Sequence, residues 1–316
     1  MEYVLDFEKP LLELEKKISE LVENKDSNEE LKILEAKLKE LSSSVYNSLS
    51  YWDRVQLSRH PLRPHALDYI NGLVDDFHAI HGDRNFGDDH SMVTGFGHLE
   101  GKRVCLIGIE KGRKTKEKIH HNFGMPRPEG YRKALRVMKL AERFNLPIIT
   151  FVDTPGAYPG IDAEERGQAQ AIAENIAQMF DLKTPIISYI IGEGGSGGAL
   201  GIAVADRVIM LEFSIYSVIS PESCASILWS DAKRAPDAAE SLKIDAKKAA
   251  ELGVVDTVLE EPQGGAHRHH EKALALMKKD IIKNLNELKA MELPVLMKKR
   301  FEKFRQMGHS SMEEQL

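Results

Sequence analysis

Two segments of the chain repeat one order of elements: a short apolar run, a turn containing glycine, and a helical stretch. PIITFVDTPGAYPG begins at Pro147, and PIISYIIGEGGSGG begins at Pro185. Short apolar runs bounded by turn residues favour strands that are buried on both faces. Because strands joined through helices must be connected by crossovers, this pattern predicts an α/β protein with a buried, largely parallel sheet.

The flanking sequence continues this alternation. A turn at Glu100-Gly101-Lys102 separates two of the expected strands, and a helix is expected to open near Ser196 or Gly197. We expect strands over residues 92–99, 103–110, 147–152, 185–191 and 207–211, and helices over 129–145 and 163–180.

Both ends of the chain show helical periodicity instead. Apolar residues recur at spacings of three and four between Leu11 and Val45, interrupted by turn residues at 24–28, which predicts an αα-hairpin. Its apolar seams can face each other, the globular body or a partner. Two amphipathic helices are expected over 270–288 and 293–307. We therefore divide the chain into a helical hairpin and linker (1–60), a core (61–262) and a C-terminal helical segment (263–316).

Composition excludes several classes of protein. A formal net charge of −6 argues against general nucleic-acid binding, and no apolar stretch approaches the length of a membrane span. The first residues lack the profile of a signal peptide, so we expect a cytoplasmic protein. Cys105 and Cys224 are the only cysteines, which excludes a disulfide framework and a four-cysteine zinc site.

The densest group of glycines follows the strand expected at 185–191. It reads GEGGSGGALG over residues 192–201. So many glycines indicate that the backbone itself approaches another group closely. A helix opening there would offer unpaired N–H groups to an anion or a developing oxyanion. Tight packing between layers is the alternative explanation.

Two enzyme motifs also match this segment. Gly192, Gly194 and Gly197 fit a dinucleotide fingerprint with Glu212 downstream. Ser196 fits the nucleophile elbow of a hydrolase, for which Asp231, Asp256 and His267 follow in the required chain order. The absence of lysine after Gly198 excludes a P-loop.

Three further groups of residues are candidates for a site. Residues 153–160 form a second glycine-bearing turn, in which Tyr158 offers a flat wall, although two ordinary turns would look the same. The basic run that includes Lys111, Arg113 and Lys114 can bind phosphates or an acidic partner, or simply be solvated. Histidines at 120, 121, 267, 269 and 270 lack nearby ligands at metal spacing, so we expect them at the surface and predict no metal site.

The motifs closely resemble the alpha subunits of bacterial-type acetyl-coenzyme A carboxylase carboxyltransferase. The matching strings span the chain in order: LDFEKPLLELEKKI, WDRVQLSRHPLRP, HGDRNFGDD, NFGMPRPEGYRKALRVMKLAERF, FVDTPGAYPG, EERGQ, IGEGGSGGALG, YSVISPE and EPQGGAHR. One departure is Ser223, where the family pattern has glycine.

The resemblance implies a crotonase-like fold of stacked ββα units and a function as half of an enzyme. A separate beta subunit would bind acetyl-CoA and carry a zinc ribbon, in an expected α2β2 assembly. Together they would transfer the carboxyl group of carboxybiotin, held on the biotin carboxyl carrier protein and formed by biotin carboxylase, to acetyl-CoA. The product would be malonyl-CoA for fatty acid synthesis.

The same resemblance assigns the site. Backbone donors for carboxybiotin would come from Gly194, Gly195, Gly197, Gly198 and Ala199. Gly156, Ala157 and Tyr158 would form the opposing wall, and Lys111, Arg113 and Lys114 would meet CoA phosphates or the biotin carrier. Two alternatives stay open: a crotonase-fold hydrolase or isomerase that acts alone on an acyl-CoA, and a non-catalytic scaffold.

Overall fold

The computed structural model describes residues 3–24 and 28–308, and in this part of the chain eight strands form one mixed sheet. The first two strand pairs are antiparallel and the other pairs are parallel. The order is β1 (His78–Ala79), β2 (Met92–Leu99), β3 (Lys102–Ile109), β4 (Ile148–Thr154), β5 (Ile186–Gly195), β6 (Arg207–Leu211) and β8 (Thr257–Leu259), while β7 (Ile215–Ser217) pairs with the end of β5. The predicted α/β class, with its largely parallel sheet, is confirmed.

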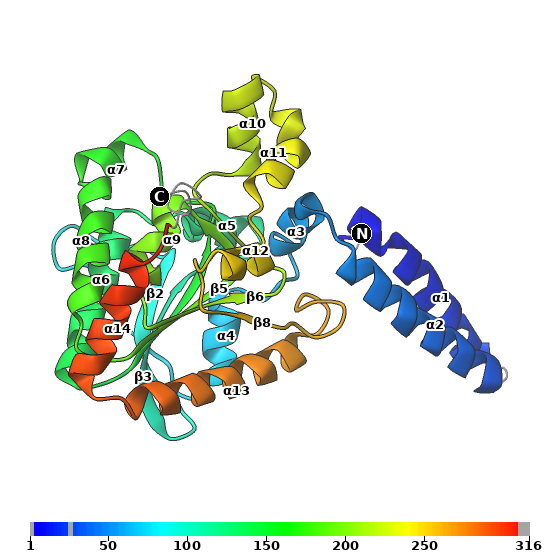
Figure 1. Cartoon of the computed structure of the whole chain (residues 1–316), viewed down its shortest axis with the longest axis horizontal. Helices are drawn as coiled ribbons and strands as arrows, with labels where there is room; N and C mark the ends of the chain where they lie inside the picture. The colour runs from blue at the N-terminus through cyan, green and yellow to red at the C-terminus, as the bar shows by residue number, and fades with distance from the viewer. Residues whose placement is uncertain (1–2, 25–27, 309–316) are drawn as a thin grey trace, which may run out of the picture.

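Helices cover both faces of this sheet (Figure 1). One apolar core lies between the sheet and α6 (Pro128–Arg143), α8 (Gln168–Asp181) and α9 (Ser196–Ala203). A second core lies between the opposite face and α4 (Ala66–Leu73) and α13 (His270–Lys289). Since the central strands are buried on both faces, their sequences read as continuous apolar runs rather than as alternating ones.

Most of the expected elements are found within a few residues of their predicted bounds. The turn between β2 and β3 is confirmed, with positive φ at Glu100 (47°) and Gly101 (71°), as a tight hairpin requires. The prediction of a single helix over 163–180 is wrong in one respect, because the structure has two helices there, α7 (Ile161–Glu165) and α8. Gly167 separates them in the left-handed region, with φ of 81°.

The N-terminal segment forms the expected helical hairpin. A short turn, η1 (Asp6–Glu8), leads into α1 (Lys9–Asn24), which packs against α2 (Asn28–Asn47). Residues 25–27 of the expected turn lie outside the described residues. The hairpin extends away from the sheet (Figure 1), and its base packs on Phe213 of the body. Near the base the apolar seams thus face both each other and the body.

Smaller helices occur between the longer elements. They are α3 (Tyr51–Ser58), α5 (Thr115–His120), η2 (Asn122–Gly124), α10 (Pro221–Trp229), η3 (Ala232–Arg234), α11 (Ala235–Leu242) and α12 (Ala246–Glu251). Ser223 lies exposed in the first turn of α10, where its N–H donates to the hydroxyl of the capping residue Ser220 (3.2 Å). The departure from the family pattern at this position is therefore accommodated within an ordinary helix cap.

The C-terminal helices α13 and α14 (Leu293–Arg305) confirm the two helices expected there, and residues 309–316 of that segment lie outside the described residues. Arg300 of α14 is fully buried and forms a bidentate pair with Asp206, at 2.9 and 2.7 Å. Its remaining donors bind the carbonyls of Met179, Leu182 and Thr184, each at 2.8 Å. One arginine therefore ties the last helix to the end of α8 and the start of β5.

A second buried pair joins the start of the core to its end. Arg63, which precedes α4, pairs with Glu261 and also donates to the carbonyl of Ile191 at 2.7 Å. Both side chains are almost completely buried. None of the helices in the described part of the chain has both the length and the apolar character needed to cross a membrane.

Candidate functional site

The glycine cluster forms the turn between β5 and α9. β5 continues through Gly194 and Gly195, and α9 begins at Ser196, so the predicted start of this helix is confirmed. Ser196 has a φ of 52°, in the left-handed region, which lets the strand turn sharply into the helix.

The turn after β4 lies against this glycine turn. β4 and β5 are adjacent and parallel, so their carboxyl ends meet at one edge of the sheet. A Cβ on Gly198 would stand 2.5 Å from the backbone of Gly156 and Ala157, and one on Gly195 would overlap the carbonyl of Pro155. Only glycine allows this approach. The expected juxtaposition of the two turns is confirmed.

The start of α9 borders a cavity at this edge of the sheet. The first N–H groups of a helix lack intrahelical partners and carry its positive dipole end. Gly198 and Ala199 are buried there, whereas Ser196 and Gly197 line a cavity of 220 Å³. Leu200, Tyr216, Ser217, Val218 and Val254 complete its lining. An oxygen that gains negative charge near this helix end would be stabilised.

The second turn is held rigid by its own hydrogen bonds. The Thr154 hydroxyl accepts the N–H of Gly156 (3.0 Å), and the Tyr158 N–H donates to the carbonyl of Pro126 (3.0 Å). The guanidinium of Arg127 lies over the Tyr158 ring, 4.7 Å from its centroid. Pro155, Gly156 and Ala157 touch the glycine turn. Neither they nor Tyr158 are among the residues that line the cavity, so the role of this turn as a wall stays a prediction.

The basic run is divided by the fold. Lys111 is largely buried, and its ammonium lies 2.7 Å from both Asp153 and Glu193. Arg113 pairs with Asp68, while Lys114 is exposed at the start of α5. The three residues thus do not form one open surface. Lys111 packs against the residues that lead into the two turns and is not part of a solvated loop.

The hydrolase alternative receives limited support from the geometry. Ser196 does occupy a left-handed strand-to-helix turn, as a nucleophile would. However, its three possible partners are engaged elsewhere. Asp231 accepts an N–H within its own turn, Asp256 pairs with a lysine of α14, and His267 pairs with the acid of the N-terminal segment. No triad is assembled on Ser196 from these residues.

The dinucleotide alternative also meets a structural objection. In that fingerprint the first two glycines lie in the tight turn after the strand, where they approach the pyrophosphate. Here Gly192 and Gly194 lie within β5, and Asp153 packs against Gly192. Glu212, the candidate for the ribose, accepts the backbone N–H of Glu261 (3.1 Å).

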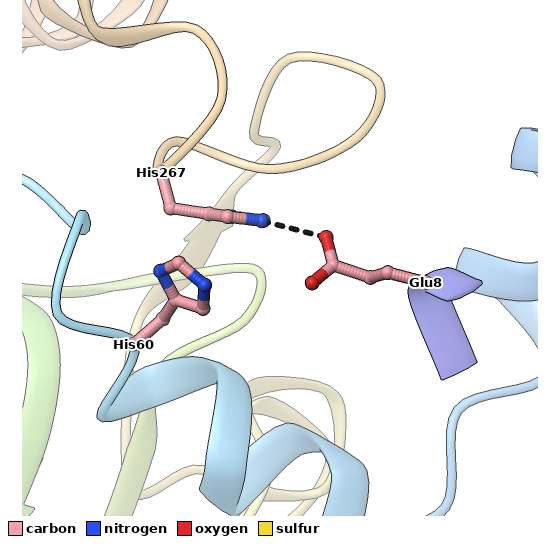
Figure 2. A group of neighbouring side chains, drawn as sticks. All are labelled: Glu8, His60 and His267. Atoms are coloured by element: carbon pink, nitrogen blue, oxygen red, sulfur yellow. Dashed lines mark hydrogen bonds and ion pairs between the residues drawn. The ribbon is translucent and has the colours of Figure 1, made fainter. Parts of the chain in front are cut away.

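One cluster among the described residues brings three possible metal ligands together: Glu8, His60 and His267 (Figure 2). Their ligand atoms lie within 4.8 Å of one another. A metal-bound imidazole normally donates from its second nitrogen. The Nδ1 of His60 instead accepts the N–H of Leu62 (3.2 Å), and its Nε2 lies 3.3 Å from the carbonyl of Tyr3. The cluster does not fit a metal centre and is better described as a buried hydrogen-bonded junction.

The histidine predictions need one correction. His267 is only 5% exposed, so its expected place at the surface is wrong. Its Nε2 lies 2.8 Å from Glu8, a partner in the N-terminal segment that the sequence spacing does not reveal. His120 is exposed, and His269 and His270 are partly exposed.

Sequence reasoning missed the charges beneath the glycine turn. Arg59, Asp153, Glu193 and Glu222 join Lys111 in one network at the ends of β3, β4 and β5. The only signal in the sequence is that Asp153 and Glu193 each end a strong apolar run, where a charge is unexpected unless it is paired.

Comparison with known proteins identifies the family. Residues 4–308 match the family described as acetyl co-enzyme A carboxylase carboxyltransferase-like. The chain belongs to this carboxyltransferase family. The acetyl-coenzyme A carboxylase carboxyl transferase subunit alpha of Geobacter metallireducens is 55% identical over 311 residues, which cover 97% of this chain and 98% of the relative. The subunit of the same name from Methylococcus capsulatus is 54% identical, with 98% of each chain covered. Membership of the carboxyltransferase family confirms the predicted enzyme class, a transferase.

Solved structures agree with this family at the level of the fold. A transcarboxylase 12S structure aligns with a TM-score of 0.57 and 19% identity, over 71% of this chain and 41% of the other. A Pseudomonas malonate decarboxylase hetero-tetramer in complex with coenzyme A gives a TM-score of 0.59 at 16% identity, over 74% and 91%. These likenesses confirm the crotonase-like fold.

Proposed function

We propose that this chain is the alpha subunit of an acetyl-CoA carboxyltransferase and supplies the half of the active site that faces carboxybiotin. The beta subunit would supply the acetyl-CoA half, and the pair would form malonyl-CoA for fatty acid synthesis. Identities of 55% and 54% to two alpha subunits, over nearly the whole of each chain, support this function. The single structural observation that carries it is the start of α9, where backbone donors border a cavity beside a second glycine turn.

The chemistry explains why the site consists of backbone rather than of acidic or basic side chains. The N–C bond of carboxybiotin breaks, which leaves negative charge on the ureido group. The ureido nitrogen then takes a proton from the methyl group of acetyl-CoA, and the resulting enolate carbon forms a bond to the released carboxyl carbon. Both intermediates carry oxyanions, and one well-placed donor contributes about 3 to 4 kcal/mol to stabilising such charge.

Individual residues receive roles within this proposal. The donors for the ureido oxygen come from Gly194, Gly195, Gly197, Gly198 and Ala199. Gly156 and Ala157, which contact Gly198, would form the opposing wall together with Tyr158. Arg113 and Lys114 lie on the adjacent basic loop, where they would meet CoA phosphates or the carrier protein.

Carboxybiotin arrives as a substrate on the biotin carboxyl carrier protein after biotin carboxylase has formed it. Zinc belongs to the beta subunit, because Cys105 and Cys224 cannot build a zinc ribbon. We propose an α2β2 assembly in the cytoplasm. Residues 1–60 would mount the core of 61–262 in this assembly, and residues 263–316 would brace that core.

A reconstitution experiment tests the function. The purified chain, the candidate beta subunit and their mixture are each assayed for carboxyl transfer from malonyl-CoA to biotin. We expect turnover only in the mixture. Turnover by this chain alone would favour the hydrolase or isomerase alternative, and silence in the mixture would contradict the proposal.

A further inference from the structure

A buried network of charges lies directly beneath the glycine turn. Lys111 follows β3, Asp153 lies near the end of β4, and Glu193 lies near the end of β5. The Lys111 ammonium is 2.7 Å from both carboxylates. The residue thus joins three neighbouring strands at the edge where α/β proteins place their ligand sites.

The network also reaches the helices at that edge. Arg59, at the end of α3, donates to Glu193 at 2.6 Å and to Glu222 of α10 at 2.5 Å. Two cations and three carboxylates are therefore shared between two helices and three strand ends. Breaking such a group by removing one member leaves a buried charge without its partner.

The network fixes the backbone that leads into the donors. The Asp153 carboxylate accepts the N–H of Glu193 at 2.9 Å, and Glu193 immediately precedes Gly194. A side chain on Gly192 would collide with the same carboxylate. The position of the glycine turn relative to β4 is thus determined by Asp153, and Lys111 holds Asp153 and Glu193 together.

The Lys111 ammonium is poorly placed to bind a substrate itself. Its side chain is 15% exposed. Burial lowers the pKa of Lys111, but the charges of Asp153 and Glu193 outweigh burial and raise it above its usual value, so the ammonium stays charged. Both of its close partners belong to the protein, which leaves little of its charge for an external phosphate.

The loop that covers Lys111 carries backbone strain. Asn122, Phe123 and Gly124 follow one another in the left-handed region, with φ of 47°, 56° and 74°. A Cβ on Gly124 would lie 2.6 Å from Cγ of Lys111 and 3.2 Å from the carbonyl of Asp153. Non-glycine residues in this conformation each cost about 1 kcal/mol or more, and such strain gathers at functional sites.

From these contacts we propose that Lys111 is a positioning residue for carboxyl transfer: through Asp153 and Glu193 it holds the β5–α9 turn so that its N–H donors face the cavity. This inference rests on the proposed function and reassigns Lys111 from contact with substrate phosphates. It predicts that loss of the ammonium affects the chemical step more than the binding of CoA substrates.

The test compares Lys111→Met with a matched control, Lys303→Met, in the complex with the beta subunit. Lys303, on α14, also forms a largely buried ion pair: it lies 2.8 Å from Asp256, and its side chain is 18% exposed. This pair lies at the start of β6, where Asp256 accepts the N–H of Val208, and not at the glycine turn. We expect Lys111→Met to lower kcat about 10- to 100-fold while KM for malonyl-CoA stays within about twofold. Lys303→Met should keep kcat within about twofold.

A second variant tests the same network with a more conservative substitution, in case Lys111→Met does not fold. Asp153→Asn keeps an oxygen that can accept the N–H of Glu193 but removes the charge that faces Lys111. We expect a fall in kcat of about tenfold, again without a matching rise in KM. Thermal unfolding and co-elution with the beta subunit establish that each variant is folded and assembled.

The outcomes separate this inference from the proposed function. An inactive wild-type mixture would contradict the function itself. An active wild type with unchanged kcat in both Lys111→Met and Asp153→Asn would overturn the positioning role. A rise in KM at unchanged kcat in Lys111→Met would overturn it in favour of direct phosphate binding.

Discussion

Gly198 meets the backbone of the neighbouring turn, and this contact determines which substitutions the site tolerates. Its missing side chain lets the start of α9 approach Gly156 and Ala157. Ser196, two residues earlier, is exposed and lies at the cavity, but no histidine or carboxylate activates it among the candidates in the sequence. Substitutions at Gly198 and at Ser196 therefore distinguish a site built from backbone N–H groups from one built on a serine nucleophile.

We predict that Gly198→Val reduces carboxyl transfer to below about 1% of wild type, because the new side chain would separate the two turns. Ser196→Ala should stay within about threefold of wild type, since the proposed donors are backbone groups of its neighbours and its hydroxyl has no role in the proposed transfer. The measurement is kcat/KM in the reconstituted mixture. A serine nucleophile would instead lose at least about 1000-fold in Ser196→Ala.

Gly87→Ala serves as the control for a glycine substitution. A Cβ at Gly87 meets no atom within 4 Å, and the residue does not need positive φ. We expect activity and stability close to wild type. Comparable damage from Gly87→Ala and Gly198→Val would contradict a specific role for the contact between the turns.

Single residues also show what could not be predicted from sequence. The density of glycines after a strand is sufficient to predict that the backbone closely approaches another group, as Gly198 does. The partners of Lys111 and His267 are not predictable in this way, because they come from segments far away in the chain. A basic run and a histidine pair look the same in sequence whether they are solvated or buried.

At the scale of elements, apolar periodicity is sufficient to locate the central strands and the terminal helices. It fails where backbone conformation decides the outcome. β5 continues through glycines that carry no strand signal, because pairing with β4 and β7 holds them extended. Likewise, the helix expected over 163–180 breaks at Gly167. The sequence does not reveal this break, because the helical pattern of apolar residues continues across it.

Arg300 makes α14 part of the core rather than an attached helix. We predict that Arg300→Met lowers the free energy of unfolding by about 3 to 5 kcal/mol, because Asp206 would remain buried without its partner. Lys298→Met, on the same helix with an exposed side chain, should change stability by about 0.5 kcal/mol or less. Urea unfolding of both variants measures the difference, and a loss below about 1 kcal/mol in Arg300→Met would contradict the anchoring role.

At the scale of the whole molecule, the junction of Glu8, His60 and His267 joins the N-terminal segment to the body (Figure 2). Burial raises the pKa of Glu8, but the hydrogen bond and charge of His267, with the hydroxyl of Tyr46 and the N–H of Leu5, lower it to about 2. Burial and the charge of His267 lower the pKa of His60 to about 4. The charge of Arg63 also lowers the pKa of His60.

Both shifts predict that the junction weakens in acid. A carboxyl whose pKa is lowered by folding contributes stability above its unfolded pKa and loses it as the pH falls toward 2. A histidine whose pKa is lowered by burial also loses stability as the pH falls, here from about 6.5 toward 4, because the unfolded chain binds the proton more readily.

We predict that Glu8→Gln costs about 3 kcal/mol of unfolding free energy near pH 6, and that this cost shrinks by about 2 kcal/mol near pH 3. Urea titrations of both proteins across this range provide the measurement. Lys248→Gln, which alters an exposed pair on α12, is the control and should show no such convergence. A cost that stays constant with pH would contradict the ionised pairing of Glu8.

The pairing of Arg63 with Glu261 has a consequence for the nascent chain. These partners are 198 residues apart in sequence, and Arg59 and Glu193 are 134 apart. Contacts of such high order form slowly, because the long intervening segments must be ordered first. Until residue 261 has been synthesised, Arg63 therefore lacks the carboxylate that neutralises it in the folded protein. The contacts of Lys111 with Asp153 and Glu193 can form before that moment, so the link between the start and the end of the core is the later one to be completed.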